Sequence, residues 1–296
     1  MFPDKYNVQE FVPTRAYTKI NIGGPGRFLA EIDQTEDLIA LVRHCIREKI
    51  RYVVLGHGSN VFFSDKGFPG LVIVNSCKEM KLTGKTSVRC ESGMALSALN
   101  RWCVENSLTG FEFSSGIPGT IGGAIFGNAG AYGKNIGQCL MGAAVLMPNG
   151  SVLSVERDFF EFAYRDSSLK RNRGIVLSAD FAFEKGAREK IVHKVKDILA
   201  MRAAKLPPEH IATAGSYFKN LKDEAGQPVP AAKYLESVGS KETVIGGMRV
   251  FEGHANIFVN SGSATADDLL KLECLLKKRV QEKYRLVLER EVMYLF

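Results

Sequence analysis

Two glycine-rich segments are the strongest sign of chemistry in this 296-residue sequence. The first follows the apolar run Tyr52–Leu55. Glycine lets a backbone turn tightly, and successive N–H groups that point into one concavity bind phosphate oxygens. From this segment alone, a phosphate-binding loop and an ordinary glycine turn are equally well supported. Its residues are Gly56, His57, Gly58, Ser59 and Asn60.

The second segment has too little side-chain mass to pack as an ordinary core, so we expect its backbone to lie against a large flat group or against phosphates. The interspersed isoleucines favour an ordered, half-buried path over a flexible loop. Neither segment matches G-x-G-x-x-G or G-x-x-x-x-G-K-[ST], which disfavours a Rossmann site and a P-loop ATPase. Dinucleotide binding by another fold stays open. The residues are Gly116, Ile117, Pro118, Gly119, Thr120, Gly122 and Gly123, and glycines continue to Gly133.

Spacing alone does not find an active site among the polar residues. Arg165, Ser216 and Glu291 are each, from composition alone, better explained as structural or surface residues. No G-x-S-x-G motif surrounds Ser216, which disfavours an acyl-transfer nucleophile. The five histidines show no ligand spacing, so no metal site is predicted.

The composition is that of an ordinary water-soluble globular protein, with 45% hydrophobic and 24% charged residues. A net charge of +7 attracts anionic molecules. We interpret the basic groups near residues 170 and 278 as solvated helix faces rather than a nucleic-acid stripe.

The six scattered cysteines lack a C-x-x-C pair and are expected to be buried thiols. The charged N-terminus predicts no secretory signal, and the uncharged stretches 113–133 and 135–155 are expected to form loops and short strands rather than membrane spans.

Periodicity predicts a mixed α and β fold with some antiparallel pairing. We expect Thr35 to cap the first helix, Asn149-Gly150 to turn a hairpin, and Pro207-Pro208 to mark the main boundary. Thr265 and Asp268 resemble a capping box. The expected strands cover residues 27–32, 52–55, 71–74, 86–90, 144–147, 151–155, 175–183, 256–259 and the tail 286–296. The expected helices cover residues 35–46, 95–106, 190–202, a short segment ending near residue 239, and residues 267–283.

Taken in order, nine segments resemble the UDP-N-acetylenolpyruvoylglucosamine reductases, the flavoenzymes that complete UDP-N-acetylmuramate in bacterial peptidoglycan synthesis. The resemblance runs from about residue 18 to residue 292. Any one segment would be weak evidence, but all of them in this order are highly specific. They are residues 18–24 (TKINIGG), 55–60 (LGHGSN), 116–123 (GIPGTIGG), 128–133 (NAGAYG), 164–167 (YRDS), 214–220 (AGSYFKN), 245–247 (IGG), 254–256 (HAN) and 291–292 (EV).

The resemblance implies an α+β fold with a two-subdomain FAD-binding region similar to the vanillyl-alcohol-oxidase type. The expected subdomains are residues 1–76 and 77–204. A C-terminal α/β substrate lobe, residues 205–296, would follow, and its tail would return to the active site. The two glycine segments would hold non-covalent FAD, which explains their missing side chains. NADPH would be the co-substrate.

The family reaction passes hydride from NADPH to FAD and then to the enolpyruvyl ether of UDP-N-acetylglucosamine. By resemblance, Arg165 and Glu291 flank the substrate carboxylate and stabilise an enol-like intermediate, and Ser216 protonates the adjacent carbon. The implied substrate-binding residues are Arg202, Lys205 and Asn220. The implied partners are small molecules only, with no nucleic acid, membrane insertion or protein partner, and the implied location is the cytoplasm.

Three departures from the family pattern stand out. Gly253 precedes His254, where family members often have lysine. In the long form of the family, an insertion after the Tyr-Arg motif carries a tyrosine that covers the substrate. Here a strand is expected from residue 175, which leaves no room for that insertion after Arg165. We therefore interpret this chain as the short form. Ile20-Asn21 replaces the usual aromatic and basic pair.

Three alternatives to the reductase are an FAD oxidase or dehydrogenase of related fold, a nucleotide- or flavin-binding module without catalysis, and a nucleic-acid-binding protein. An oxidase that removes hydride from its substrate also needs a base, and the set of Ser216, Arg165 and Glu291 argues against it. A protein without flavin would favour the non-flavin module, and steep salt-dependent affinity for DNA or RNA would favour the last.

Overall fold

The computed structural model describes residues 2–223 and 226–296, which form two compact units. The first unit comprises residues 1–9, 28–57 and 70–202. The second comprises residues 10–27, 58–69 and 203–296. Each unit is therefore built from segments that are far apart in the sequence. The division into domains at residues 76 and 204 stays a prediction.

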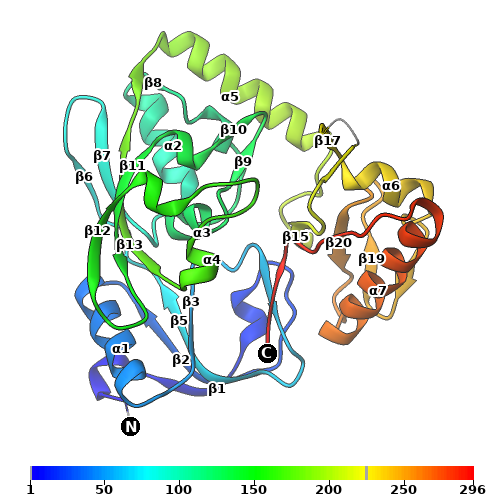
Figure 1. Ribbon diagram of the computed structural model, residues 1–296, viewed down its shortest axis with the longest axis horizontal. Coiled ribbons are helices and arrows are strands. Elements are labelled where there is room, and N and C mark those ends of the chain that lie inside the picture. Colours follow the sequence, from blue (N-terminus) through cyan, green and yellow to red (C-terminus); the bar gives the residue numbers. More distant parts are fainter. Residues whose placement is uncertain (1, 224–225) are drawn as a thin grey trace. The chain divides into compact units, whose positions relative to one another are not determined.

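The first unit begins with a helix packed on a small sheet (Figure 1). The sheet order is β1 (Gln9–Pro13), β2 (Pro25–Ile32), β5 (Phe68–Asn75) and β3 (Tyr52–Leu55), and β3 and β5 are parallel. Residues 10–13, 25–27 and 68–69 of these strands belong to the second unit. Helix α1 (Thr35–Arg47) buries its apolar stripe against these strands, as its helical spacing predicts. The predicted cap is wrong. The helix already includes Thr35, and Thr35 Oγ1 donates to Glu91 Oε1 at 2.6 Å instead of capping.

A five-stranded antiparallel sheet forms the rest of the first unit, in the order β12-β11-β13-β7-β6. The predicted hairpin is present, because Leu146 pairs with Val152 and Gly150 turns the chain with φ +83°. Figure 1 shows α2 and α3 beside this sheet, and their apolar side chains share one core with it. The bounds are β6 (Met80–Leu82), β7 (Ser87–Glu91), α2 (Leu96–Glu105), α3 (Ile121–Phe126), β11 (Leu140–Leu146), β12 (Val152–Glu156) and β13 (Ile175–Ala182).

We expected only loops and short strands in the glycine-rich stretch from residue 113, but the stretch also contains a helix. Residues 121–126 form helix α3, and the Thr120 hydroxyl accepts a hydrogen bond from the Gly123 N–H at 3.4 Å. The N-cap bond offsets the low helix propensity of paired glycines. The other elements of this unit are β8 (Leu108–Thr109), β9 (Gly130–Ala131), β10 (Lys134–Asn135), α4 (Leu169–Asn172), β14 (Glu184–Lys185) and α5 (Arg188–Ala203), whose last residue belongs to the second unit.

The second unit packs two helices with a four-stranded antiparallel sheet in the order β15-β20-β19-β18. The capping box at Thr265 and Asp268 is confirmed, since each side chain accepts the backbone N–H of the other residue. The bounds are β15 (Ala212–Ser216), β16 (Leu221–Lys222), β17 (Pro228–Val229), α6 (Ala231–Ser237), β18 (Val244–Ile245), β19 (Met248–Val250), β20 (Ile257–Asn260) and α7 (Ala266–Tyr284).

The C-terminal tail is strand-like over a shorter length than expected. Only β21 (Met293–Leu295) is a strand, and it runs parallel to β4 (Val61–Phe63). Residues 286–292 instead follow α7 as an irregular segment with one bridge, between Arg290 and Phe218. Within the described ranges, no helix is both long and apolar enough to cross a membrane.

Four of the six cysteines are buried, as their scattered positions predict, whereas Cys139 is partly buried and Cys274 is exposed. Cys45, Cys77, Cys90 and Cys103 are buried, and burial raises the pKa of the Cys45 thiol to about 11. Cys274 is exposed on α7, because it lies on the solvent side of that helix. Buried thiols with raised pKa values are poor nucleophiles.

Candidate active site

The two glycine-rich segments meet within the first unit. A Cβ atom on Gly56 would lie 2.2 Å from Thr120 Oγ1, and one on Gly122 would lie 3.0 Å from the Cβ of Ser92. Gly119 has φ +133°, which favours glycine. The side chains of Thr120 and Ser92 approach these two backbone positions so closely that only glycine fits, and the segments themselves expose mostly main chain. Such a surface suits the flat rings and phosphates of a dinucleotide, so the residues fit FAD.

The start of the second glycine segment is tied to the end of helix α5. Arg202 Nη2 donates to the Gly116 carbonyl at 2.7 Å, and Gly116 has φ +72°. Burial lowers the pKa of the Arg202 guanidinium, and the Tyr132 hydroxyl partly offsets this effect. The Gly119 carbonyl accepts the Leu96 N–H at 3.0 Å, which fixes the segment against α2. Arg202 thus lies next to the expected cofactor segment.

Arg165 lies in a tight turn that another motif segment, residues 128–133, holds in place. Ala163 and Asp166 exchange backbone hydrogen bonds at 3.2 Å, and Arg165 takes φ +54° in the turn. The Arg165 guanidinium donates to the Gly130 carbonyl at 2.9 Å, and the Asn128 amide donates to the Ala163 carbonyl at 2.8 Å. The structure therefore joins residues 128–133 and 164–167, two of the segments that carry the family resemblance.

The first glycine segment is divided between the two units after His57. In the second unit, Gly58 has φ +56°, its carbonyl accepts the Lys19 N–H at 3.0 Å, and a Cβ atom there would lie 1.9 Å from the Tyr17 carbonyl oxygen. Asn60 reaches the C-terminal tail, because its amide donates to the Glu291 carbonyl at 3.3 Å. Gly58 thus anchors the segment, and Asn60 links it to Glu291.

Ser216 and Glu291 are brought together within the second unit. The Glu291 N–H donates to the Tyr217 carbonyl at 2.8 Å, and the Lys219 N–H donates to the Glu289 carbonyl at 2.9 Å. Ser216 is exposed, whereas Tyr217 next to it is buried. A hydroxyl and a carboxylate are therefore held on adjacent backbone segments, with the hydroxyl accessible to a substrate.

Asn256 holds the backbone beside Ser216 and was not assigned a role from the sequence. Its side chain accepts the Phe218 N–H at 2.9 Å and donates to the Phe218 carbonyl at 2.8 Å. Its own carbonyl accepts the Tyr217 N–H at 2.8 Å. Asn256 is buried, so the loss of these bonds would leave polar groups without water. The sequence signal that could have indicated this role is the motif at residues 254–256, which includes Asn256.

Lys205, Asn220 and His254 lie in the same unit as Ser216. Asn220 is exposed, and its side-chain oxygen accepts the Ala231 N–H at 3.3 Å at the start of α6. Lys205 is exposed. Burial lowers the pKa of His254, and the charges of Lys241 and Lys205 lower it further. Glu236, which pairs with Lys241, acts in the opposite direction on His254.

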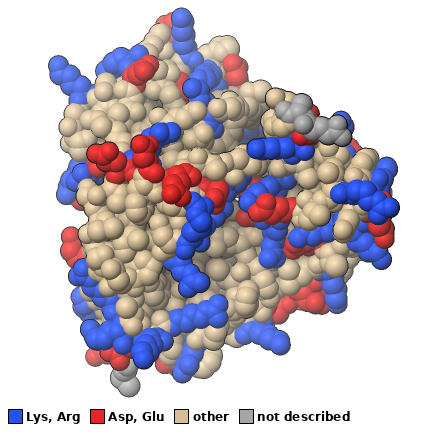
Figure 2. All heavy atoms as spheres, viewed as in Figure 1, with Lys and Arg blue, Asp and Glu red and all other residues tan. Residues whose placement is uncertain are grey.

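The basic groups on helices are largely paired with acids. Arg171 contacts Asp166 at 2.8 Å, and Lys277 contacts Glu273 at 2.7 Å. On the face that Figure 2 shows, Lys and Arg are interspersed with Asp and Glu and form no single basic stripe. Such a distribution is typical of solvated surfaces.

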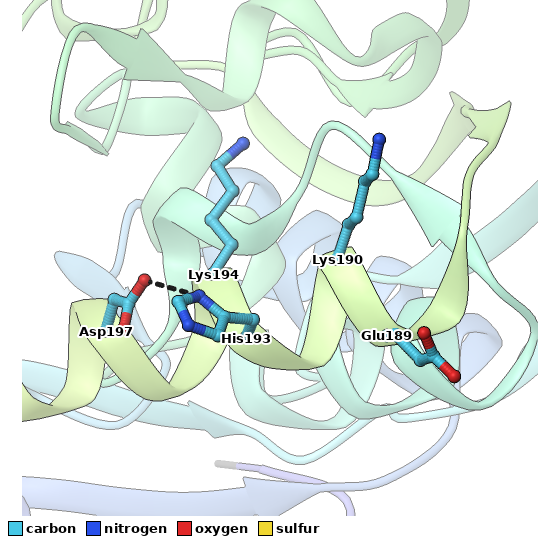
Figure 3. A pocket seen from close by; sticks show the side chains of 5 residues that line it. All are labelled: Glu189, Lys190, His193, Lys194 and Asp197. Atoms are coloured by element: carbon cyan, nitrogen blue, oxygen red, sulfur yellow. Dashed lines mark ion pairs between the residues drawn. The ribbon is translucent and has the colours of Figure 1, made fainter.

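A shallow pocket on α5 is a separate feature, lined by the residues drawn in Figure 3. His193 Nδ1 lies 2.8 Å from Asp197, but the His193 side chain is 80% exposed. The pocket contains none of the residues expected in the site. Its lining residues are Glu189, Lys190, His193, Lys194 and Asp197. In the described part of the chain, no group of three or more His, Cys, Asp or Glu residues could hold a metal ion.

Comparison with known proteins agrees with this geometry. The FAD binding domain family matches residues 27–156, and the family of UDP-N-acetylenolpyruvoylglucosamine reductase C-terminal domains matches residues 207–295. The fold and the glycine-lined site thus define an FAD-binding oxidoreductase with a distinct C-terminal domain. The predicted α+β fold class is confirmed.

Curated relatives define the family more closely. A reductase of this name from Clostridium kluyveri is 35% identical over 95% of this chain and 90% of its own length. One from Caldanaerobacter subterraneus subsp. tengcongensis is 36% identical over 95% and 91%. The crystal structure of the Thermus caldophilus reductase superposes with a TM-score of 0.81 at 27% identity and covers 96% of this chain and 98% of that one. The chain belongs to the UDP-N-acetylenolpyruvoylglucosamine reductase family.

Proposed function

We propose that this protein reduces UDP-N-acetylglucosamine enolpyruvate to UDP-N-acetylmuramate in peptidoglycan precursor synthesis. NADPH is the reductant. Bound FAD supplies the chemistry that accepts hydride from NADPH and passes it to the enolpyruvyl group. The observation that carries the proposal is the direct backbone link between the Ser216 and Glu291 segments, in a chain of the reductase family.

Ser216 is the proton donor in this proposal. After hydride arrives at the methylene carbon, negative charge spreads toward the substrate carboxylate, and the adjacent carbon needs a proton. A serine hydroxyl is a weak acid, but a strongly basic enol-like carbon can take its proton when the hydroxyl is held in place. The backbone bonds of Tyr217 and Phe218 to Asn256 hold the segment that carries this hydroxyl.

Arg165 and Glu291 bind and polarise the substrate carboxylate. A guanidinium beside the developing charge stabilises it more strongly as that charge grows. Arg165 is suited to this because hydrogen bonds with Gly130 and Asn128 hold its turn and its guanidinium in place before substrate binds. Glu291 favours the protonated, enol-like form of the carboxylate by hydrogen bonding to it.

Cofactor and substrate phosphates are assigned to separate groups. The cofactor-binding residues are Gly56, His57, Gly58, Ser59, Asn60, Gly116, Ile117, Pro118, Gly119, Thr120, Gly122 and Gly123. The close approaches of neighbouring atoms at Gly56, Gly58, Gly116 and Gly122 support this assignment. Arg202, Lys205 and Asn220 bind the substrate, and the cations attract its diphosphate. Cytoplasmic action on small molecules, without a nucleic acid, membrane or protein partner, completes the proposal.

An anaerobic visible spectrum tests the function in one cuvette. The purified protein, supplied with FAD if needed, should be yellow. NADPH should bleach it, and UDP-N-acetylglucosamine enolpyruvate should restore the colour. Bleaching without restoration would retain a flavoenzyme and refute the substrate. A protein that binds no FAD would refute the proposal altogether.

A further inference from the structure

A buried carboxylate on helix α7 connects the neighbours of Ser216 and Glu291. Glu273 is 7% exposed and lies on the apolar stripe of α7, between Leu269 and Leu276. Its Oε2 accepts the Tyr217 hydroxyl at 2.7 Å and lies 3.3 Å from Arg290 Nη1. Lys277 contacts its Oε1 at 2.7 Å. Tyr217 follows Ser216 in the chain, and Arg290 precedes Glu291.

A carboxylate in this position is not explained by packing. Burying a charge is costly unless it is paired, and apolar side chains of similar size usually stabilise a core as well or better. The three partners of Glu273 satisfy that requirement, and two of them come from the backbone segments of the proposed site. The same two segments already share the hydrogen bond from the Glu291 N–H to the Tyr217 carbonyl.

We propose that Glu273 is a positioning residue, a role that rests on the proposed function. It fixes Ser216 and Glu291 relative to each other through Tyr217 and Arg290. The backbone bond fixes the spacing of the two segments at one point. The Glu273 carboxylate adds a second point through side chains, which restricts rotation of both segments about that bond. Displacement of a reacting group by about 1 Å can slow a reaction about 100-fold.

The surroundings keep Tyr217 in the donor form that this role needs. Burial raises the pKa of Tyr217, and the Glu273 carboxylate raises it further. The Tyr217 ring also stacks on Phe258 with centroids 4.5 Å apart, and Arg290 lies over the rings of Phe62 and Tyr294. The ring contacts thus hold the side chains of Tyr217 and Arg290 in place. A change at Glu273 is therefore transmitted to the backbone rather than absorbed by side-chain motion.

The test separates the two half-reactions in variants of Glu273. Rapid-mixing absorbance measures flavin reduction by NADPH and then flavin reoxidation by saturating UDP-N-acetylglucosamine enolpyruvate. In Glu273→Leu, reduction should stay within about twofold of wild type, whereas reoxidation should slow about 10-fold to 100-fold. Glu273→Gln keeps an acceptor for the Tyr217 hydroxyl and should recover most of the rate. Tyr217→Phe removes the hydroxyl that donates to Glu273, and its reoxidation rate should fall between those of the two Glu273 variants.

Thr265→Ala is the matched control, since it destabilises the same helix at its first turn without touching Tyr217 or Arg290. It should leave the ratio of the two rates unchanged. Should Glu273→Leu not fold, Tyr217→Phe carries the test, and Glu273→Gln is its reference. Equal loss in both half-reactions, or unchanged reoxidation in Glu273→Leu or Tyr217→Phe, would overturn the positioning role. Failure of the wild-type protein to be reoxidised would refute the proposed function, and the inference would fall with it.

Discussion

The Ser216 hydroxyl is exposed at the end of β15, directly before two aromatic residues that are each 1% exposed. Replacing Ser216 with alanine removes the proposed acid without disturbing that packing. We expect flavin reduction by NADPH to persist and reoxidation by substrate to slow about 100-fold to 10,000-fold, the usual contribution of a positioned acid or base. Rapid-mixing absorbance separates the two steps.

Ser263→Ala is the control for this change, because Ser263 is another exposed serine of the second unit. It should behave as wild type in both steps. An equal loss in both half-reactions of Ser216→Ala would contradict the assigned role, since a proton donor to the substrate has no part in flavin reduction.

His254 gives stability a pH dependence whose direction follows from its burial. Burial lowers the pKa of His254 below the ordinary 6.5, so the unfolded chain binds its proton more readily than the folded one. The contribution is therefore fully present above pH 6.5 and is lost as the pH falls through and below that value. His254→Asn removes the titration while its side-chain oxygen can still accept the Asn256 N–H, which His254 Nδ1 accepts at 3.2 Å.

Guanidinium unfolding at about pH 8 and about pH 5.5 measures the effect. The wild-type protein should lose more free energy of unfolding between these values than His254→Asn does. The other histidines are common to both proteins and cancel in the comparison. Equal losses in the two proteins would show that His254 does not carry this dependence.

At this scale, the sequence indicated residues that act through short motifs but missed residues that act through distant contacts. Ser216, Arg165 and Glu291 were found only because the order of nine segments is specific. Glu273 was missed because its partners lie 56 and 17 residues away. One local signal was present, since an acid lies among the inward positions Leu269, Leu272 and Leu276 of α7.

At the scale of elements, the turn after β3 and the N-terminus of α3 depend on each other. Gly56→Ala would place a Cβ atom 2.2 Å from Thr120 Oγ1, and relief of such a clash costs about 1–3 kcal/mol. We expect the affinity for FAD to fall roughly 10-fold to 100-fold. Titration of the stripped protein with FAD, followed by flavin fluorescence, measures the change.

Gly127→Ala serves as the matched glycine control. Gly127 has φ −95°, and an added Cβ atom would only meet the Gly123 carbonyl oxygen at 3.6 Å. FAD affinity should remain within about twofold of wild type in that variant. Normal FAD affinity in Gly56→Ala would contradict the close approach of these two elements.

Elements with strong periodicity or specific turn residues were predictable, and elements set by tertiary context were not. The hairpin at Asn149-Gly150 and the capping box of α7 depend on local chemistry, so both were found. Helix α3 was missed because paired glycines disfavour a helix, and the Thr120 cap together with core packing overrides that preference. The tail was expected to be extended throughout, but only β21 has a neighbouring strand to pair with.

At the scale of the whole molecule, net charge should govern how fast anionic substrates arrive. The charge is +7, and both NADPH and a UDP-sugar are anions. Raising the ionic strength from about 0.02 M to about 0.5 M shortens the Debye length severalfold. The second-order rate constant for flavin reduction by NADPH should therefore fall, while the limiting rate at saturating NADPH stays nearly constant. Stopped-flow measurements over a range of NADPH concentrations give both values.

Sodium chloride and potassium chloride should give the same result at equal ionic strength, because screening does not depend on the identity of the ion. A second-order rate constant that does not change with salt would show that net charge has no part in capture.

The interleaved construction of the two units has a consequence for biosynthesis. Every segment of the first unit precedes residue 203, so that unit can form while the chain is still being made. Ile20, Ile22 and Phe62 belong instead to the core of the second unit, whose helices and main sheet come from residues after 203. Until those residues leave the ribosome, these early apolar side chains have no core to enter. During that interval they are the part of the nascent chain most exposed to misfolding and most suited to recognition by a chaperone.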